Sequence, residues 1–229
     1  MSLSLPGNGY GNTFVDEREK NRTKGICPYL SMFFRAGITM TKEPKLQKLT
    51  KIAGTKFVQL YKGIFELPNG NTKEYDIVSR KEITDIKNVE PAAVTMFATN
   101  QAGDKMLIVK EFRYPVNKEV IDTPSGLIDP GEDPVTAALR ELHEETGYTD
   151  AEVVEVLPAS YSTIGLTNES VVPVILRVNE NVNEGQCTED SEKIEPYWVT
   201  RDEAAEILKS SDIAARAQLA IRMFVNGCL

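Results

Sequence analysis

The chain has 229 residues, of which 41% are hydrophobic and 26% charged, and its formal net charge is −8. This length allows one large domain or a domain with a smaller appendage, and the composition is that of an ordinary soluble globular protein. The excess of acidic residues, without a Lys/Arg stripe, argues against a nucleic-acid partner, and the lack of an apolar run of roughly 20 residues argues against a membrane span.

The first 39 residues show no clear hydrophobic period, and their longest apolar patch, around Ile26 to Phe34, is interrupted by Pro28. Acidic residues precede this patch, which argues against a secretory signal peptide. We interpret residues 1–39 as a loosely ordered extension, or as residues foreign to the native protein, and Met40 as the start of the folded part.

From about Thr55 the sequence becomes typical of β-structure. Residues 56–80 predict two strands joined at Asn69-Gly70, a dipeptide that favours a type I′ hairpin turn because both residues tolerate a positive φ. We therefore expect an N-terminal antiparallel β subdomain over residues 40–88, followed by the main domain over residues 89–229.

The main domain is predicted to contain mostly strands, with one helix between them. The predicted order is a hairpin of residues 92–98 and 105–113, an extended piece at 119–126, the helix, and strands at 151–157 and 169–178. Two helices close the chain. The first begins at a capping box of Thr200 and Glu203, and the second ends near Gly227. The predicted fold class is therefore α+β, as an α/β/α sandwich preceded by the β subdomain.

Three local signals bound the central helix. Asp133 is a good N-cap, Pro134 suits the first helical position, and Gly147 falls where a C′ glycine belongs. The helix should therefore run from about Pro134 to Thr146. An apolar stripe at i, i+3, i+4 and i+7 is expected to be buried, and it consists of Val135, Ala138, Leu139 and Leu142.

Glu141, Glu144 and Glu145 share a different face of this helix, close to its C-terminus. Like charges at this spacing repel by about 0.2–0.5 kcal/mol per pair, and the helix dipole adds roughly 0.3–1 kcal/mol. Arg140 offsets only part of this. A solvated acidic face is the usual explanation for a charge run. The alternative is a divalent cation, and oxygen ligands without a His or Cys pair favour Mg²⁺ or Mn²⁺.

The wider spacing favours the cation. Gly126, Glu132, Arg140-Glu141-Leu142, Glu144-Glu145 and Gly147-Tyr148 stand at intervals that resemble the Nudix box, a loop–helix–loop signature too long to arise readily by chance. The resemblance extends from about Phe57 to the C-terminal helices. Residues 110–132 look like the ADP-ribose pyrophosphatase branch of the Nudix hydrolases, in which an arginine after a strand and a Pro-small-Gly turn precede the box.

The resemblance implies a Nudix α/β/α sandwich and a set of metal ligands. Glu141 and Glu145 would be the principal ligands, Glu144 a further ligand or a water-mediated contact, and the backbone carbonyl of Ser125 another ligand. Charge-assisted hydrogen bonds from Arg140 would orient the glutamates.

Catalysis also requires support for the site and a general base. The resemblance implies that Glu132 supports the site and that the base comes from a loop outside the box. Alignment of the residues that follow this loop points to Glu192, with Glu189 as the second choice. A solvated acidic turn is an equal alternative for the loop.

Substrate contacts are expected from two arginines and two aromatic residues. Arg80 and Arg113 would pair with phosphates, since arginine binds them in a bidentate manner. Phe57 and Tyr75 fall where the family places aromatic residues that stack on adenine, often across the interface of a homodimer formed through residues 40–88. Each could equally be a half-buried strand residue.

The implied activity is metal-dependent hydrolysis of a nucleoside diphosphate linked to another moiety, with ADP-ribose as the leading substrate and AMP and ribose 5-phosphate as products. Ile164 before Gly165, where the family usually has a proline, leaves other NDP-sugars open, such as GDP-mannose or UDP-glucose. A nucleotide sensor that does not cleave its ligand is the other alternative. Three widely spaced cysteines suit a reducing compartment, so we expect a cytoplasmic protein without a membrane partner.

Overall fold

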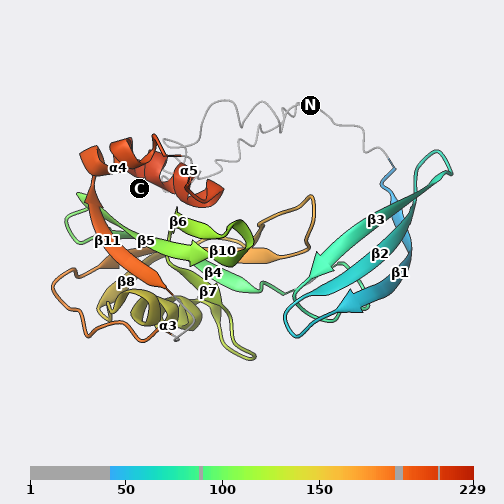
Figure 1. Ribbon diagram of the computed structural model, residues 1–229, viewed down its shortest axis with the longest axis horizontal. Helices are drawn as coiled ribbons and strands as arrows, with labels where there is room; N and C mark the ends of the chain where they lie inside the picture. The colour runs from blue at the N-terminus through green and yellow to red at the C-terminus, as the bar shows by residue number, and fades with distance from the viewer. Residues whose placement is uncertain (1–41, 88–89, 189–192, 211) are drawn as a thin grey trace, which may run out of the picture. The chain divides into compact units, whose positions relative to one another are not determined.

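The computed structural model describes residues 42–87, 90–188, 193–210 and 212–229 (Figure 1). The expectations for residues 1–39, for Glu189 and for Glu192 lie outside these ranges.

A three-stranded antiparallel sheet begins the described chain. Its strands are β1 (Lys45–Gly54), β2 (Gln59–Glu66) and β3 (Thr72–Ser79), in the order β1-β2-β3. The sequence did not predict β1, because nearly all of its side chains are exposed and no apolar alternation marks one face. The β2–β3 hairpin is confirmed.

The turn type predicted for this hairpin is wrong. Gly70 has a φ of +82°, but Asn69 has no positive φ, and the N–H of Gly70 donates to the carbonyl of Leu67 at 2.9 Å. Pro68 and Asn69 are therefore the central residues of the turn. A type I′ turn needs a positive φ at both central positions, whereas proline fixes φ near about −65°. Gly70 takes the left-handed position after the turn instead.

The second sheet has eight strands and a central path β11-β5-β4-β10-β8. β4 pairs with β10 in parallel and with β5 in antiparallel orientation, so the sheet is mixed. β6 pairs with β5, β7 with β4, and β9 with β10. The bounds are β4 (Ala93–Asn100), β5 (Lys105–Arg113), β6 (Lys118–Asp122), β7 (Ser125–Leu127), β8 (Ala151–Val156), β9 (Ser160–Tyr161), β10 (Ser170–Val178) and β11 (Ile194–Thr200), with a short 3₁₀ helix η2 (Tyr114–Val116) after β5.

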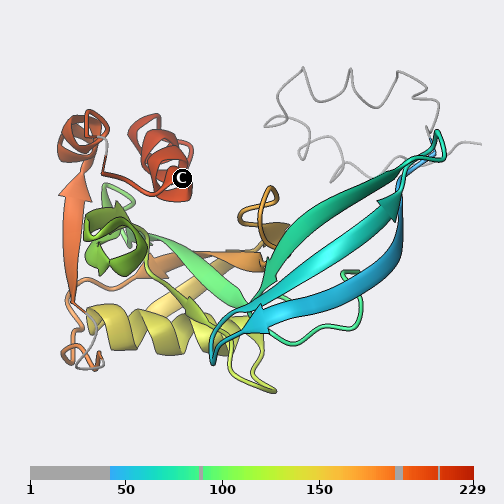
Figure 2. The same ribbon diagram turned by 45° about the vertical axis from the view of Figure 1, so that its right-hand side comes forward.

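Helices cover both faces of this sheet. Helix α3 (Pro134–Thr146) lies on one face, and α4 (Arg201–Ile207) and α5 (Ala215–Val225) lie on the other (Figures 1 and 2). Strand β5 shows the alternation: Leu107 packs in the core with α3, while Met106 and Ile108 pack with α4 and α5. The α/β/α sandwich is confirmed. Within the described ranges, none of the helices has the length and apolar character that a bilayer crossing requires.

The predicted bounds of α3 are also confirmed. The Asp133 carboxylate accepts the backbone N–H groups of Val135 and Thr136, and Gly147 has a φ of +79°. The buried stripe differs slightly from the prediction. Ala138 and Leu142 are buried as expected, joined by Ala137, whereas Val135 and Leu139 are only half-buried.

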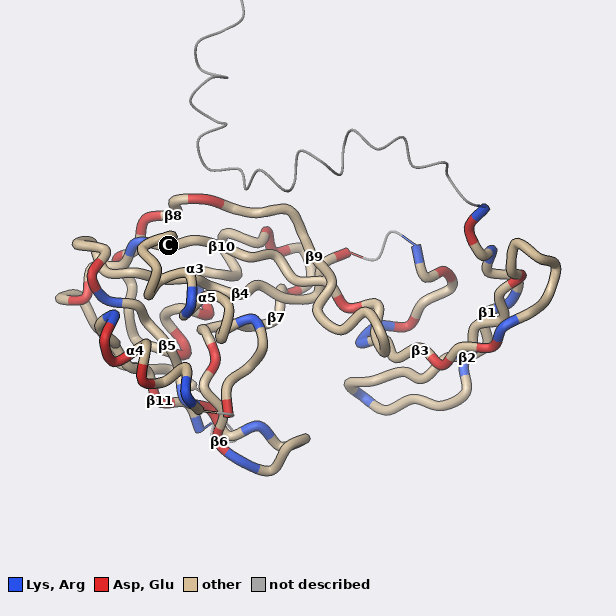
Figure 3. Tube along the Cα trace, turned by 90° about the horizontal axis from the view of Figure 1, so that it is seen from above, with Lys and Arg blue, Asp and Glu red and all other residues tan. Residues whose placement is uncertain are grey.

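The C-terminal helix signals hold as well. The Thr200 side chain and Glu203 form the predicted capping box at the start of α4, and Gly227, with a φ of +71°, follows the end of α5. Lys and Arg positions are scattered among Asp and Glu positions over the described trace (Figure 3).

The end of β3 runs beside the loop before β10. The N–H of Val78 donates to the carbonyl of Leu166 at 2.9 Å, and the Tyr75 hydroxyl donates to the carbonyl of Gly165 at 2.9 Å. An ion pair joins Arg80 to Glu169. These contacts bring Arg80, which follows β3 directly, to the edge of the second sheet.

Candidate active site

A cavity of about 570 Å³ is lined by residues that lie far apart in the chain. Its lining contains ten charged side chains, six acidic and four basic: Glu111, Asp129, Glu141, Glu144, Glu145 and Glu169, with Arg80, Arg113, Arg140 and Arg216. The remaining lining includes Ser125, Gly126 and Cys187. Most of the residues that the sequence indicated are therefore gathered around one cavity.

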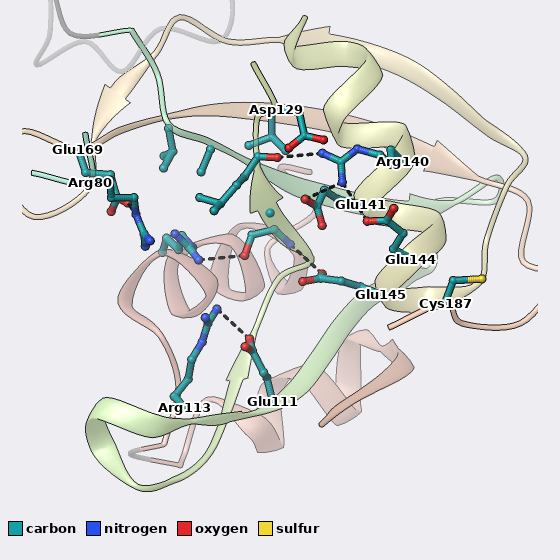
Figure 4. Close-up of a pocket in the computed structure, with 17 residues that line it drawn as sticks. Arg80, Glu111, Arg113, Asp129, Arg140, Glu141, Glu144, Glu145, Glu169 and Cys187 are labelled. Atoms are coloured by element: carbon teal, nitrogen blue, oxygen red, sulfur yellow. Dashed lines mark hydrogen bonds and ion pairs between the residues drawn. The ribbon is translucent and has the colours of Figure 1, made fainter. Parts of the chain in front are cut away.

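Acidic side chains line more than one side of the cavity, but those of α3 face two of the arginines. Helix α3 contributes Glu141, Glu144 and Glu145, while Arg80 and Arg113 approach from the opposite side (Figure 4). A molecule bound between them would meet carboxylates on one side and guanidinium groups on the other.

Arg140 connects the acidic residues of the box. Its Nε and Nη2 each donate to a different Glu132 oxygen at 2.9 Å. Its Nη1 donates to both Glu141 Oε1 and Glu144 Oε2 at 2.9 Å. The hydrogen bonds to Glu132 and Glu141 raise the pKa of Arg140 above its ordinary value and outweigh its partial burial. Arg140 therefore offsets part of the like-charge repulsion, and the same contacts lower the pKa of Glu132.

Glu145 is in a different environment from its two neighbours. It lies three residues after the buried Leu142, so its side chain points toward the sheet and is 7% exposed. Its Oε2 accepts the backbone N–H of Ser125 at 2.9 Å. Burial raises the pKa of this carboxyl well above its ordinary value, because the Ser125 hydrogen bond and Arg113 only partly compensate for lost solvation. The three glutamates were predicted to share one face of α3. In the structure the side chain of Glu145 is buried, so only part of that face is accessible to solvent.

Gly126 allows Glu141 to reach the cavity. A Cβ at residue 126 would lie 1.8 Å from the carboxyl carbon of Glu141, which is far closer than two carbon atoms can approach. The glycine of the box is therefore required by the position of that carboxylate.

The ligand atoms on the α3 side of the cavity suit a hard divalent cation, because all are oxygen atoms and one belongs to the buried Glu145 carboxylate, whose hydrogen bond within the described residues comes from the neutral Ser125 N–H. In the residues that the structure describes, no three acidic, His or Cys side chains already converge on one ion position. The Arg140 contacts to Glu141 and Glu144 explain part of this, since they direct both carboxylates toward the guanidinium.

Carboxylates hold Arg80 and Arg113, the arginines that form the basic wall of the cavity. Arg80 pairs with Glu169, and Nη2 of Arg113 lies 2.8 Å from Glu111 and 3.4 Å from Asp122. Each arginine keeps exposed side-chain surface, 48% for Arg80 and 39% for Arg113, so each retains room for an anion.

Phe57 and Tyr75 do not line the cavity of their own chain. Phe57 is 66% exposed and precedes β2, so it is not a half-buried strand residue. Tyr75 is 40% exposed, and its hydroxyl donates to the carbonyl of Gly165. A lysine of the same chain lies over each ring, Lys56 Nζ at 4.9 Å from the Phe57 centroid and Lys73 Nζ at 5.4 Å from the Tyr75 centroid, and both rings keep exposed surface.

Sequence reasoning missed five charged or thiol-bearing residues of the cavity: Glu111, Asp129, Glu169, Cys187 and Arg216. Glu111 could have been found, since it lies two residues before Arg113 on a strand and therefore on the same face. No sequence signal marked Arg216 on α5. Cys187 gave no signal either, although its backbone N–H donates to the Glu144 carbonyl at 3.0 Å.

Comparison with known proteins gives the same fold and family. The family profile described as NUDIX domain matches residues 89–219. The ADP-ribose pyrophosphatase of Bacillus subtilis (strain 168) is 30% identical over 171 residues, which cover 75% of this chain and 86% of that protein. The ADP-ribose pyrophosphatase of Saccharomyces cerevisiae is 33% identical over 178 residues, or 72% and 76% of the two chains. A crystal structure described as an ADP compounds hydrolase superposes with a TM-score of 0.61 and 19% identity, covering 82% of this chain and 97% of that one.

Proposed function

The chain belongs to the NUDIX domain family, and on this premise we propose that it is a Nudix pyrophosphatase that hydrolyses ADP-ribose to AMP and ribose 5-phosphate. In this reaction water attacks one phosphorus of the diphosphate, and the bridging oxygen leaves with the other phosphate. The names of the two relatives support the choice of substrate.

The charge distribution in the cavity carries the proposal. Carboxylates of α3 face Arg80 and Arg113 across a space of about 570 Å³, which is large enough for a nucleotide fragment. A diphosphate needs positive groups on its oxygens, and hydrolysis also needs groups that position water and accept its proton. Arginines and carboxylates both line this cavity, which supports the proposal.

The proposed cation site is the acidic wall of the cavity, which the carboxylates of α3 form. Glu141, Glu145, Glu144 and the carbonyl of Ser125 would hold Mg²⁺ or Mn²⁺. Such a cation neutralises phosphate oxygens and makes water a better nucleophile at neutral pH. The buried Glu145 supports this assignment, because a nearby cation would stabilise its charged form.

The protein's own groups position the reactants. Arg140 is the proposed positioning residue for Glu141 and Glu144, with Glu132 fixing the guanidinium plane through two hydrogen bonds. Glu144, the most exposed of the three helix glutamates with 40% of its side chain accessible, is the proposed contact to water. Glu192 remains the proposed general base and Glu189 the second choice.

We assign substrate recognition to residues from both chains of a homodimer. Arg80 and Arg113 would bind the phosphates, and Phe57 and Tyr75 would stack on adenine in the cavity of the partner chain. Their exposure and their absence from the cavity of their own chain support an action in trans. We also propose that residues 40–88 form the dimerisation and substrate-contact subdomain, that residues 89–229 form the hydrolase domain, and that the enzyme acts in the cytoplasm.

A substrate panel tests the proposal directly. The protein is incubated with ADP-ribose, GDP-mannose and UDP-glucose in the presence of Mg²⁺, and the products are identified by mass spectrometry. We expect AMP and ribose 5-phosphate from ADP-ribose, formed faster than the products of the other two. Faster hydrolysis of GDP-mannose or UDP-glucose would identify another NDP-sugar pyrophosphatase. Tight binding of ADP-ribose without turnover would identify a nucleotide sensor.

A further inference from the structure

Arg216 reaches the cavity from α5, on the opposite face of the sheet from α3. Its Nε and Nη2 lie 3.3 and 3.0 Å from the two carboxylate oxygens of Asp122, and Nη2 also lies 3.2 Å from Ser125 Oγ. The Asp122 side chain is 3% exposed, whereas that of Arg216 is 34% exposed and lines the cavity. A buried carboxylate therefore fixes one edge of the guanidinium and leaves part of the side chain at the cavity wall.

The geometry leaves one nitrogen of Arg216 available. Nε and Nη2 make the contacts to Asp122 and Ser125, and Nη1 has no acceptor among the residues that the structure describes. A guanidinium held through a two-nitrogen contact is already oriented, so an anion that binds Nη1 does not have to immobilise the side chain.

The position of Arg216 in its helix is unfavourable without an anion. It lies in the first turn of α5, which contains no acidic residue, and Ala214 at the N-cap provides no side-chain hydrogen bond. The N-terminus of a helix carries partial positive charge, so an arginine there is repelled. Asp122 compensates for one charge, but it also contacts Arg113 at 3.4 Å. The single carboxylate of Asp122 is therefore shared between two arginines of the cavity lining, Arg113 and Arg216.

We propose that Arg216 is a third phosphate-binding residue of the active site, which contacts the diphosphate through Nη1 while its other nitrogens are held by Asp122 and Ser125. This inference rests on the proposed pyrophosphatase function. It places arginines from three elements on the basic wall: Arg80 after β3, Arg113 at the end of β5, and Arg216 on α5.

Substitution of Arg216 tests this contact. R216Q is expected to raise the KM for ADP-ribose roughly ten- to a hundredfold, the loss typical of one charge-assisted hydrogen bond, while kcat changes little. R216K should fall between the wild type and R216Q, because lysine keeps the charge but not the two-nitrogen contact. The matched control is R222Q, an exposed arginine of the same helix, which should retain the wild-type KM. An unchanged KM in R216Q would overturn the proposal.

A second variant separates phosphate binding from support of the fold. R216Q leaves the buried Asp122 with the Thr123 N–H at 2.8 Å and, among the described cationic groups, only the longer contact to Arg113, so we expect the variant to be less stable. The double variant D122N/R216Q removes that buried charge. If its KM stays raised while its melting temperature returns to that of the wild type, Arg216 binds substrate. A wild-type KM in the double variant would show that Arg216 serves only to neutralise Asp122, and the proposal would fall.

Binding measurements keep this inference separate from the proposed function. If the wild type does not hydrolyse ADP-ribose, the pyrophosphatase proposal fails, but calorimetric titration with inorganic pyrophosphate and with an α,β-methylene analogue of ADP-ribose still tests Arg216. A raised Kd in R216Q relative to R222Q supports the phosphate contact. Equal Kd values in the two variants overturn it.

Discussion

We expect the buried Glu145 carboxylate to lower the stability of the metal-free protein. It is 7% exposed, and among the described residues its hydrogen bond comes from the Ser125 backbone N–H rather than from a cation. A buried charge without a cationic partner destabilises the fold, and a raised pKa in the folded state expresses that penalty. Glu145 is therefore favourable for the proposed cation binding and unfavourable for the stability of the metal-free fold.

The E145Q variant separates the effect of this charge on stability from its effect on turnover. Glutamine keeps an acceptor for the Ser125 N–H but carries no charge, so we expect the metal-free variant to be more stable than the wild type by about 1–3 kcal/mol. The turnover of ADP-ribose should fall by orders of magnitude. Melting temperatures in EDTA and in Mg²⁺, together with kcat, measure both effects.

Metal linkage provides the control for E145Q. Mg²⁺ should raise the melting temperature of the wild type and of E155Q, an exposed glutamate of β8, more than that of E145Q. A near-normal kcat in E145Q, or an equal Mg²⁺ shift in all three proteins, would remove Glu145 from the cation site.

Gly126 provides a steric test of the same wall. In G126A the new methyl group would occupy the position of the Glu141 carboxyl group, at 1.8 Å, so that side chain has to move. We expect kcat/KM to fall by roughly 100-fold, since misplacement of a reacting group by about 1 Å is enough for such a loss. G165A is the matched control because a Cβ there meets no atom within 4 Å. Equal kcat/KM values in G126A and G165A would show that Glu141 does not need its observed position.

Helix α3 carries the glutamates proposed to bind the cation, and its first turn depends on an ionised cap. Hydrogen bonds from the side chain and then the backbone of Thr136 hold the pKa of Asp133 below its ordinary value of 3.8. A lowered pKa in the folded state means that the cap contributes stability above the unfolded pKa, and that this contribution is lost as pH falls through the lower folded value.

The pH dependence of unfolding tests this cap. Between pH 5 and pH 2.5 the melting temperature of the wild type should fall more steeply than that of D133N, because asparagine caps the helix without titrating. Above pH 5 the two curves should run parallel. Equal slopes throughout would show that Asp133 does not couple protonation to folding.

Elements with local sequence signals were predicted better than elements that only long-range pairing defines. Asp133, Pro134 and Gly147 determine the ends of α3 through adjacent backbone groups, and the predicted bounds match the structure. Strand β1 has no such signal, since its side chains are exposed and only pairing with β2 defines it. The Asn69-Gly70 turn was misassigned because Pro68, one residue earlier, fixes the turn that forms.

The cavity could be predicted only where a motif spans it. The box indicated the residues of α3 and the turn at Gly126 from the sequence alone. Burial of Glu145 required the packing of α3 on the sheet, and Arg216 reaches Asp122 across 94 residues of sequence. Contacts of this kind depend on which face of the sheet each helix covers, and no short sequence pattern indicates that face.

The exposed aromatic residues connect the single chain to the proposed dimer. Phe57 is 66% exposed, so F57A should leave the melting temperature of a chain nearly unchanged. If the ring stacks on adenine, F57A should raise KM roughly 5- to 30-fold, for about 1–2 kcal/mol of stacking. Light scattering should give a mass of twice the 25.4 kDa of one chain for the wild type and for F57A.

Mixing two defective variants decides whether Phe57 acts in the partner's cavity. E145Q chains keep Phe57 and F57A chains keep Glu145, so a mixed dimer contains one site with both residues if the ring acts in trans. Co-refolding equal amounts should place about half of the dimers in the mixed form, and ADP-ribose hydrolysis with the wild-type KM should reappear. If the ring acted within its own chain, no site of any dimer would contain both residues, and only the raised KM of F57A would be observed.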